Sequence, residues 1–223
     1  IIPDAFRIAE SGRPGPVVID VPRDVQLQEH TFEKWPDFHE KNIQDKIDNE
    51  SLSNIAGTIN KSSQPVILYG AGIIESGSEE LLLELAEKNS IPVASTLRGL
   101  GAFNPSHPLY LGMLGMHGTK YANQLTEQAD LVIALGFRFD DRATGKVSEF
   151  CKNARIIHID IDKAEIGKIK PVNLSINADL HTFLESVILL VEVNGRGEWI
   201  NQVKSLRKQM PYIKAPENGD VFH

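Results

Sequence analysis

The sequence predicts an α/β fold, in which a parallel β-sheet is covered by helices on both faces. Short runs of consecutive apolar, mostly β-branched residues alternate along the chain with amphipathic segments of helical spacing. Strands that are apolar at every position are typical of parallel sheets, because both faces of such sheets are buried. Glycines follow several of the runs, as they do in the ligand-binding turns of open α/β sheets.

The first 24 residues are predicted to be the end of a preceding domain. Residues 2–10 have helical spacing, and the apolar run 16–22 predicts a strand that ends at its proline. One helix and one strand cannot build a core, so we expect the chain to be a piece of a longer protein. The charged stretch 25–48, with Trp35-Pro36 in its middle, is predicted to be a linker.

Residues 49–194 are predicted to form a central α/β domain. Its expected elements are helix 49–62, strand 65–69, helix 77–88, strand 91–95, helix 120–128, strand 131–135, strand 155–160, a capped turn at 162–167, strand 173–177 and helix 180–193. The stretch 99–119 has no charged residue, but Pro105, Pro108 and its glycines break it, which predicts a buried or ligand-facing loop rather than a membrane span. We assign 195–223 to an amphipathic helix, from about residue 198 to 209, and a linker toward a third domain absent from this chain.

Composition excludes several functional classes. The net charge of −7 and the lack of a basic stripe argue against a nucleic-acid partner, because phosphate backbones are bound by clustered Lys and Arg. Cys151 is the only cysteine, so no internal disulfide forms and we expect a reducing compartment. The first residues do not resemble a secretory signal, and we expect a cytoplasmic protein with no membrane partner.

Glycine-rich segments at the ends of strands predict a crevice for a nucleotide cofactor. They include Thr96–Gly101, Leu114–Thr119 and Gly136–Arg142. Gly70-Ala71-Gly72 also follows a strand and could aim backbone N–H groups at a phosphate, but it could equally be only a tight strand-to-helix turn.

Charged residues and a histidine in these segments are candidate contacts for the nucleotide. Two arginines and two carboxylates lie within Arg138-Phe139-Asp140-Asp141-Arg142, and we favour a ligand site with arginine on phosphate over an exposed salt-bridged turn. His117 could contact a ring system or be structural. Asp160 and Asp179, near strand ends, could bind ribose hydroxyls or cap the turn or helix that follows, and Asp162 is a candidate cap.

No catalytic residue or metal site is predicted within the chain. His117 has no second His or Cys nearby at metal-ligand spacing. Cys151 has no activating partner in the sequence, and no Gly-x-Ser-x-Gly turn exists. The residues alone predict a binding domain.

Five longer segments occur in the order found in one enzyme family: Ser11–Val17, Ile91–Leu97, Gly115–Thr119, Arg138–Arg142 and His158–Gly167. With them the chain resembles the central part of the catalytic large subunit of acetohydroxyacid synthase, also called acetolactate synthase, a thiamine-diphosphate enzyme. The resemblance implies a catalytic chain of three α/β domains, with a Rossmann-like middle domain that holds extended FAD.

The resemblance also implies which residues bind. Its flavin site consists of Arg13, Gly70, Ala71, Gly72, Thr96, Leu97, Leu114, Gly115, Met116, His117, Gly136, Arg138, Asp140, Arg142, Asp160, Ile161, Asp179 and Leu180. Its substrate and inhibitor channel lies near Arg23, Met116, Asp141 and Arg142.

The family condenses two pyruvates to acetolactate, or pyruvate with 2-oxobutyrate, in branched-chain amino-acid biosynthesis, and its flavin takes no net redox part. The resemblance implies thiamine diphosphate and Mg²⁺ in the full-length enzyme, which is expected to be a homodimer or homotetramer with a regulatory small subunit. The family's activating glutamate and its magnesium-diphosphate motif lie in the first and third domains, so this chain alone is expected to be inactive.

Two alternatives stay open. The first is the middle domain of another thiamine-diphosphate enzyme, such as a pyruvate oxidase, glyoxylate carboligase or decarboxylase; the Met116-His117 loop and the Arg138–Arg142 run argue against it. The second is a non-catalytic domain that binds NAD or another adenine nucleotide in the same crevice.

Overall fold

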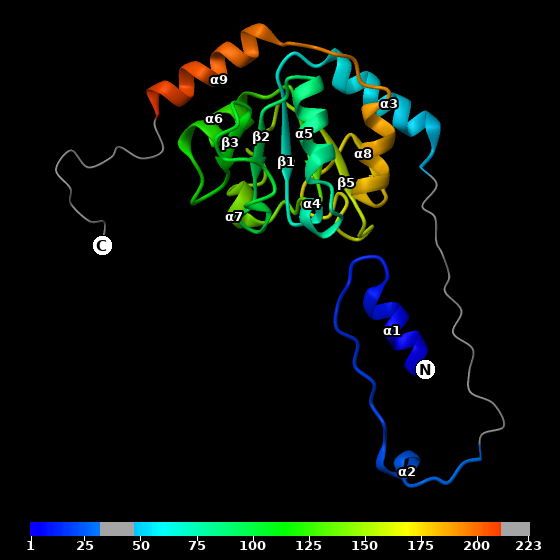
Figure 1. The fold of residues 1–223 in the computed structure, drawn as a ribbon. Helices are drawn as coiled ribbons and strands as arrows, with labels where there is room; N and C mark the ends of the chain where they lie inside the picture. The colour runs from blue at the N-terminus through cyan, green and yellow to red at the C-terminus, as the bar shows by residue number, and fades with distance from the viewer. Residues whose placement is uncertain (32–46, 211–223) are drawn as a thin grey trace, which may run out of the picture. The chain divides into compact units, whose positions relative to one another are not determined.

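The computed structural model describes residues 1–31 and 47–210, which belong to two compact units, Ile1–Asp45 and Lys46–His223 (Figure 1). Each unit is described by itself. Most of the predicted linker, with Trp35 and Pro36, and the stretch 211–223 lie outside the described residues.

In residues 1–31, the described part of the smaller unit, there are two helices, α1 (Ile2–Glu10) and α2 (Arg23–Gln26). The helix predicted over residues 2–10 is confirmed. The strand predicted over 16–22 is wrong, because no strand is present between α1 and α2. A strand needs a hydrogen-bonded neighbour, and the described part of this unit offers none. None of residues 1–31 is buried, so this part has no core of its own.

The larger unit is built on a six-stranded sheet with every pairing parallel. In spatial order its strands are β3 (Tyr110–Met113), β2 (Val93–Ser95), β1 (Pro65–Tyr69), β4 (Leu131–Leu135), β5 (Arg155–Asp160) and β6 (Leu174–Asn177). The order reverses between β1 and β4, as it does in doubly wound nucleotide-binding folds.

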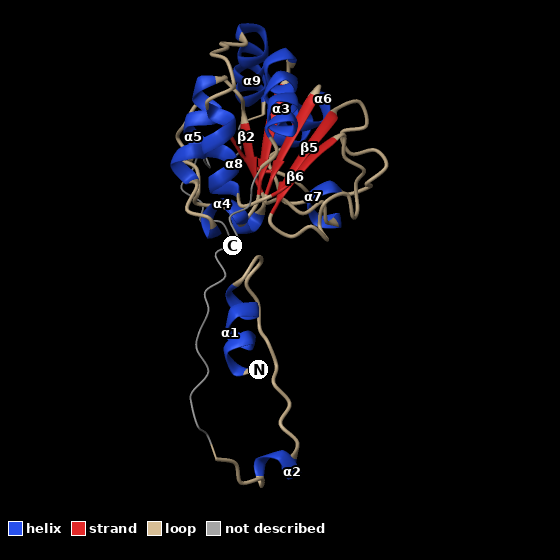
Figure 2. Cartoon of the chain, turned by 90° about the vertical axis from the view of Figure 1, so that its right-hand side faces the viewer, coloured by secondary structure: helices blue, strands red, loops and turns tan. Residues whose placement is uncertain are grey.

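Helices cover both faces of this sheet, as Figure 2 shows. They are α3 (Asn49–Lys61), α4 (Gly72–Glu75), α5 (Glu79–Lys88), α6 (Lys120–Gln128), α7 (Asp141–Thr144), α8 (Leu180–Ile188) and α9 (Gly197–Gln209), with a 3-10 turn η1 (Leu97–Gly99). The α/β fold with a parallel sheet between two helical layers is confirmed.

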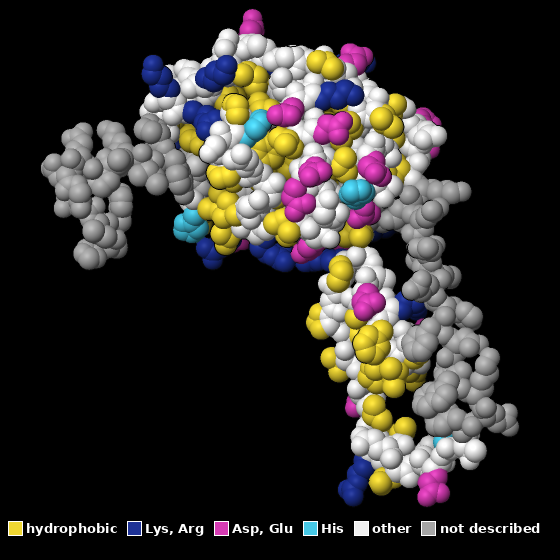
Figure 3. Space-filling view, viewed as in Figure 1, with side chains coloured by type: hydrophobic (Ala, Val, Ile, Leu, Met, Phe, Trp, Pro, Cys, Tyr) yellow, Lys and Arg dark blue, Asp and Glu magenta, His cyan; other side chains and the backbone are white. Residues whose placement is uncertain are grey.

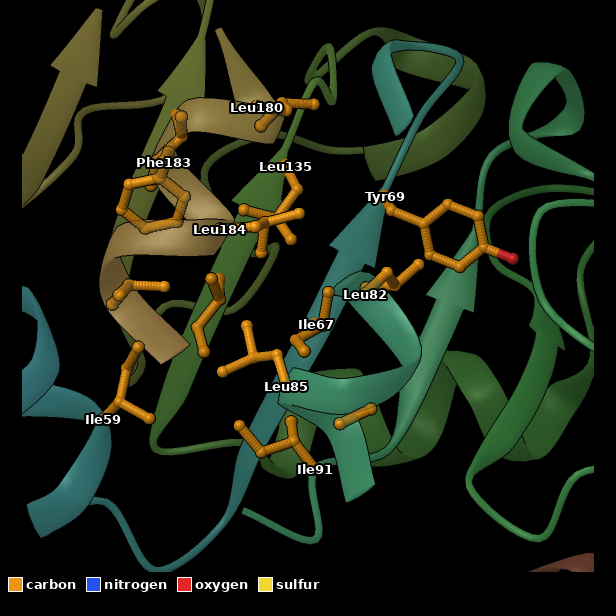
Figure 4. Packing of buried hydrophobic residues seen from close by; sticks show 14 of the residues in the cluster. Ile59, Ile67, Tyr69, Leu82, Leu85, Ile91, Leu135, Leu180, Phe183 and Leu184 are labelled. Carbon is orange, nitrogen blue, oxygen red and sulfur yellow. The ribbon is translucent and has the colours of Figure 1, made fainter. Parts of the chain in front are cut away.

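Two apolar cores result from the alternation of side chains along each strand. On β1, Ile67 and Tyr69 join the core under α3, α5 and α8, which Figure 4 shows from close by. Val66 and Leu68 face the opposite way and join the core under α6 and α9. Because β1 and β4 are buried at every position, the continuous apolar runs are explained by burial on both faces.

Several elements differ from the prediction. The charge-free stretch contains β3, a short edge strand whose sequence has no regular alternation. The helix expected over 77–88 begins at Glu79, because Gly77 has a φ of +60° and separates it from α4. The helix expected over 180–193 ends at Ile188.

Helix α9 packs on the second core rather than standing apart from it. Its Trp199, Val203 and Leu206 are buried there, and the Trp199 indole N–H donates to the Pro65 carbonyl at 3.0 Å. The predicted domain ranges stay a prediction. No helix in the described ranges has the length and apolar character needed to cross a bilayer.

Candidate functional site

The strands of the larger unit end together, so the segments that follow them meet at one edge of the sheet. Tyr69 at the end of β1 is in register with Ser95 of β2 and Leu135 of β4, and Leu135 is in register with Ile159 of β5. Ligands of open α/β sheets bind outside this edge, where the strand order reverses. Here the reversal lies between β1 and β4.

All residues assigned to the flavin site except Arg13, along with Asp141 of the channel set, lie at or just after these strand ends. They are Gly70, Ala71 and Gly72 after β1; Thr96 and Leu97 after β2; Leu114, Gly115, Met116 and His117 after β3; Gly136, Arg138, Asp140, Asp141 and Arg142 after β4; Asp160 and Ile161 at β5; and Asp179 and Leu180 after β6. Arg13 and Arg23 belong to the smaller unit, so their place in the site stays a prediction.

The Gly70-Ala71-Gly72 turn packs directly against the turn after β4. A Cβ on Gly70 would overlap the carbonyl oxygen of Gly136, and one on Gly72 would lie 2.9 Å from the Gly136 Cα. The Gly70 N–H donates to Leu135 at 3.1 Å and continues the β1–β4 ladder. These glycines therefore permit close approach of two backbone segments, which supports the tight-turn interpretation of the motif.

The loop after β3 is attached to helix α7 in the same way. A Cβ on Gly115, whose φ is +91°, would overlap the Arg142 carbonyl oxygen, and the Met116 N–H donates to that oxygen at 2.9 Å. The Met116 side chain is 65% exposed, and the Arg142 guanidinium lies 3.8 Å from its sulfur. Gly118 N–H donates back to Gly115 at 3.0 Å, which closes the loop.

The charged cluster after β4 is not a salt-bridged turn. Within the described residues, no ion pair includes Arg138, Asp140, Asp141 or Arg142. Asp140 accepts from the Ala143 N–H at 3.1 Å and caps α7, while both arginines are exposed. Figure 3 shows Lys and Arg side chains gathered along the edge of the larger unit at which α4 and α7 lie in Figure 1. Two guanidinium groups therefore lie exposed on the segment after β4, with no ion pair among the described residues.

The carboxylates at the other strand ends have local hydrogen-bonding roles. Asp160 is 7% exposed and accepts from the Asp162 N–H at 2.8 Å, and Asp162 accepts from Ala164 at 2.9 Å. Asp179 caps α8 by accepting from Thr182 at 3.1 Å. The capping interpretations are confirmed, and a role for Asp160 or Asp179 toward ribose stays a prediction.

Sequence reasoning missed two asparagines that hold this edge. Asn123 of α6 contacts Gly115 through both atoms of its amide, as acceptor at 2.7 Å and as donor at 2.9 Å. Asn177 at the end of β6 donates to the carbonyls of Asp160 and Ile161 at 2.9 and 2.8 Å. The sequence did not predict these roles, because the two asparagines belong to no motif and their hydrogen-bond partners lie on other elements.

His158 on β5 lies below this edge and is fully buried. Its ring meets Phe139 edge to face at 5.3 Å, and its Nε2 lies 3.9 Å from Asp160 Oδ2. Neither ring nitrogen has a hydrogen-bond partner within the described residues. Burial lowers the pKa of His158 from 6.5, and the Phe137 backbone and the Glu165 carboxylate offset that only in part.

We expect His158 to make the fold less stable in mild acid. Because its folded-state pKa is lowered, the unfolded chain binds more protons as pH falls below about 6.5, and folding stability falls with it. The variant His158→Leu should lose less stability than the wild type between pH 7.5 and 5. Urea unfolding at each pH measures this, and pH 8, where the histidine is neutral in both the folded and the unfolded chain, gives the reference for packing changes. Parallel losses for the two proteins would contradict the prediction.

Comparisons with known proteins agree with this architecture. The family described as "Thiamine pyrophosphate enzyme, central domain" matches residues 52–187. The chain is 47% identical over 211 residues to the acetolactate synthase isozyme 1 large subunit of Escherichia coli (strain K12), covering 95% of this chain and 37% of that protein. It is 45% identical over 231 residues to acetolactate synthase 2, chloroplastic, of Nicotiana tabacum, covering 100% of this chain and 34% of that protein.

A solved structure from Mycobacterium smegmatis, assigned as a thiamin diphosphate-dependent enzyme, shares the fold with a TM-score of 0.73. It is 23% identical to this chain and covers 86% of it, while this chain covers 37% of that protein. The chain thus spans less than half the length of the relatives named here.

Proposed function

Because the chain belongs to the thiamine pyrophosphate enzyme central-domain family, we propose that the carboxyl edge of its sheet binds FAD. The carrying observation is the pair of exposed arginines, Arg138 and Arg142, on the segment that follows β4, without a carboxylate partner in the described residues. A guanidinium forms charge-assisted, often bidentate hydrogen bonds with phosphate oxygens, so these arginines suit a diphosphate.

The residues around the arginines suit the other parts of FAD. The exposed side chains of Met116 and Leu97 offer apolar surface for a flat ring, and His117 offers a ring of its own. Asp160 and Asp179 are carboxylates at strand ends, and a carboxylate can accept from ribose hydroxyls. When bound, FAD would supply a diphosphate, a ribose and a flavin ring, which this edge would hold without a redox step.

For the whole protein we propose acetolactate synthase activity. The support is the identity of 40–47% to acetolactate synthase large subunits over nearly the whole of this chain. The proposal includes thiamine diphosphate and Mg²⁺ as cofactors, pyruvate and 2-oxobutyrate as substrates, and a regulatory small subunit as partner. The residues that would activate thiamine are proposed to lie outside this chain, so the 223-residue chain should form no acetolactate.

The FAD proposal is tested by binding. We expect saturable FAD binding, followed by flavin fluorescence, and a dissociation constant about 10- to 100-fold higher for Arg142→Ala, because one charge-assisted contact contributes about 1.5–3 kcal/mol. Arg155→Ala is the matched control, since Arg155 is exposed at the opposite end of β5 and should leave the affinity unchanged.

A competing titration with NAD distinguishes the second candidate function. The strand order is also that of dinucleotide-binding domains, which favours an adenine dinucleotide in general. Preferential binding of NAD would replace the FAD proposal. If neither ligand binds the wild-type chain, the proposed site in this chain is wrong.

A further inference from the structure

We infer that Asn123 is a positioning residue, which sets the geometry between Met116 and Arg142 without touching the ligand. This inference rests on the proposed FAD site. Asn123 lies in the first turns of α6, part-buried behind the loop that follows β3. It has no place in the glycine or arginine motifs, and its only side-chain hydrogen bonds in the described ranges are the two with Gly115.

The two hydrogen bonds of Asn123 act on two successive peptide groups. Its Oδ1 accepts from the Gly115 N–H at 2.7 Å, which belongs to the peptide that joins Leu114 to Gly115. Its Nδ2 donates to the Gly115 carbonyl at 2.9 Å, which belongs to the peptide that joins Gly115 to Met116. Because a peptide group is planar, holding its oxygen also sets the direction of its N–H.

That second peptide connects two elements of the site. Its oxygen is held by Asn123 from α6, and its N–H donates to the Arg142 carbonyl at 2.9 Å in α7. Rotation of this peptide would break both contacts together. The backbone at Gly115 is closely constrained. Gly115 adopts a φ of +91°, and a Cβ added to it would overlap the Arg142 carbonyl oxygen.

The side chains that follow from this peptide are those proposed to touch FAD. The nitrogen of the Gly115–Met116 peptide is the backbone nitrogen of Met116, a residue that is 65% exposed. The Arg142 guanidinium lies 3.8 Å from the Met116 sulfur. Asn123 therefore controls how the apolar surface of Met116 and the charge of Arg142 are presented together. The hydrophobic cores do not depend on it, since neither core includes Asn123.

The experiment compares Asn123→Ala and Asn123→Asp in the full 223-residue chain. Gln124→Ala is the matched control, because Gln124 is the next residue of α6 and its side chain has no hydrogen bond within the described residues. Three quantities are measured: the dissociation constant for FAD, the amide hydrogen-exchange rates of Gly115 and Met116, and the thermal midpoint.

We expect Asn123→Ala to raise the dissociation constant for FAD about tenfold and to speed exchange at both amides, while the thermal midpoint falls by only a few degrees. Asn123→Asp keeps the acceptor for Gly115 N–H but loses the donor to its carbonyl. It should therefore speed exchange at Met116 while Gly115 remains protected. Gln124→Ala should match the wild type in all three measurements.

Unchanged exchange at Met116 in both Asn123 variants would overturn the inference, as would faster exchange with unchanged FAD affinity. A purely structural role would lower the thermal midpoint without changing affinity at temperatures where the chain is fully folded. If the wild-type chain binds no FAD, the proposed function fails, whereas the exchange rates still decide whether Asn123 holds this peptide.

Discussion

The substitution Gly70→Ala is expected to destabilise the larger unit by about 3 kcal/mol, at the upper end of what overpacking costs. The new Cβ would overlap the Gly136 carbonyl oxygen, and the nearest atoms beyond it are also backbone. Backbone cannot rotate away as a flexible side chain can, so the ends of β1 and β4 would have to separate. The Gly70 N–H bond to Leu135 would then be lost.

Thermal unfolding measures this effect. For a chain of this length, about 3 kcal/mol corresponds to a fall in the thermal midpoint of about 6–12 °C. Gly57→Ala is the control, because Gly57 lies within α3 and a Cβ added there would meet nothing within 4 Å. It should raise stability by about 0.5–1 kcal/mol, since alanine loses less backbone entropy in a helix. A midpoint for Gly70→Ala equal to the wild type would show that the two turns can separate freely.

The second large effect is expected at Arg196, whose guanidinium is buried at the ends of two helices. It donates to the carbonyls of Ile59 at 2.8 Å and Ser62 at 3.2 Å at the end of α3, and to Asn89 at the end of α5. Burial lowers the pKa of Arg196 to about 10, so the group stays charged at neutral pH. A cation at helix C-termini is favourable, because it donates to carbonyls of the last turn and interacts with the negative end of the helix dipole.

We expect Arg196→Met to cost about 2–4 kcal/mol, because it leaves three carbonyls, in two buried contacts and one part-buried contact, without these donors. Arg196→Lys should recover part of the loss, since an ammonium keeps the charge but lacks the planar fork. Arg207→Met is the matched control on α9, the helix that follows Arg196: Arg207 makes one exposed contact, to the Pro108 carbonyl at 2.8 Å, and its loss should cost less than about 1 kcal/mol. Urea unfolding measures the free energy of unfolding of each variant. Equal losses of stability in Arg196→Met and Arg207→Met would contradict this role of Arg196.

The predicted elements differ in how well they match the structure, and burial explains the difference. The strands at 65–69, 131–135 and 155–160 match to the residue, because each lies inside the sheet and is buried at all positions or at all but its first. Strand β3 was missed because it is an edge strand with Gly112 inside it and only part of it is buried. The strand expected over 16–22 has the apolar pattern that β3 lacks, but the described residues of its unit offer no strand to pair with it.

Within the site, local chemistry could be predicted and contacts between elements could not. Asp162 and Asp179 are caps whose partners lie two or three residues away, so their spacing indicates the role. Asn123, in contrast, bonds to a residue eight positions earlier in a loop, and Arg196 reaches carbonyls more than 100 positions away. No periodicity records such a distance.

The sequence by itself determined the fold class, most of the strands and the short-range caps, because apolar runs and capping are properties of neighbouring residues. Its motifs carried the family resemblance and the candidate residues that follow the strand ends. Only the tertiary structure decided the strand order, the packing of Gly70 on Gly136, the absence of ion pairs around Arg138 and Arg142 among the described residues, and the role of Asn123. These depend on which segments meet in space. That outcome is set by the summed packing of two cores rather than by any local pattern.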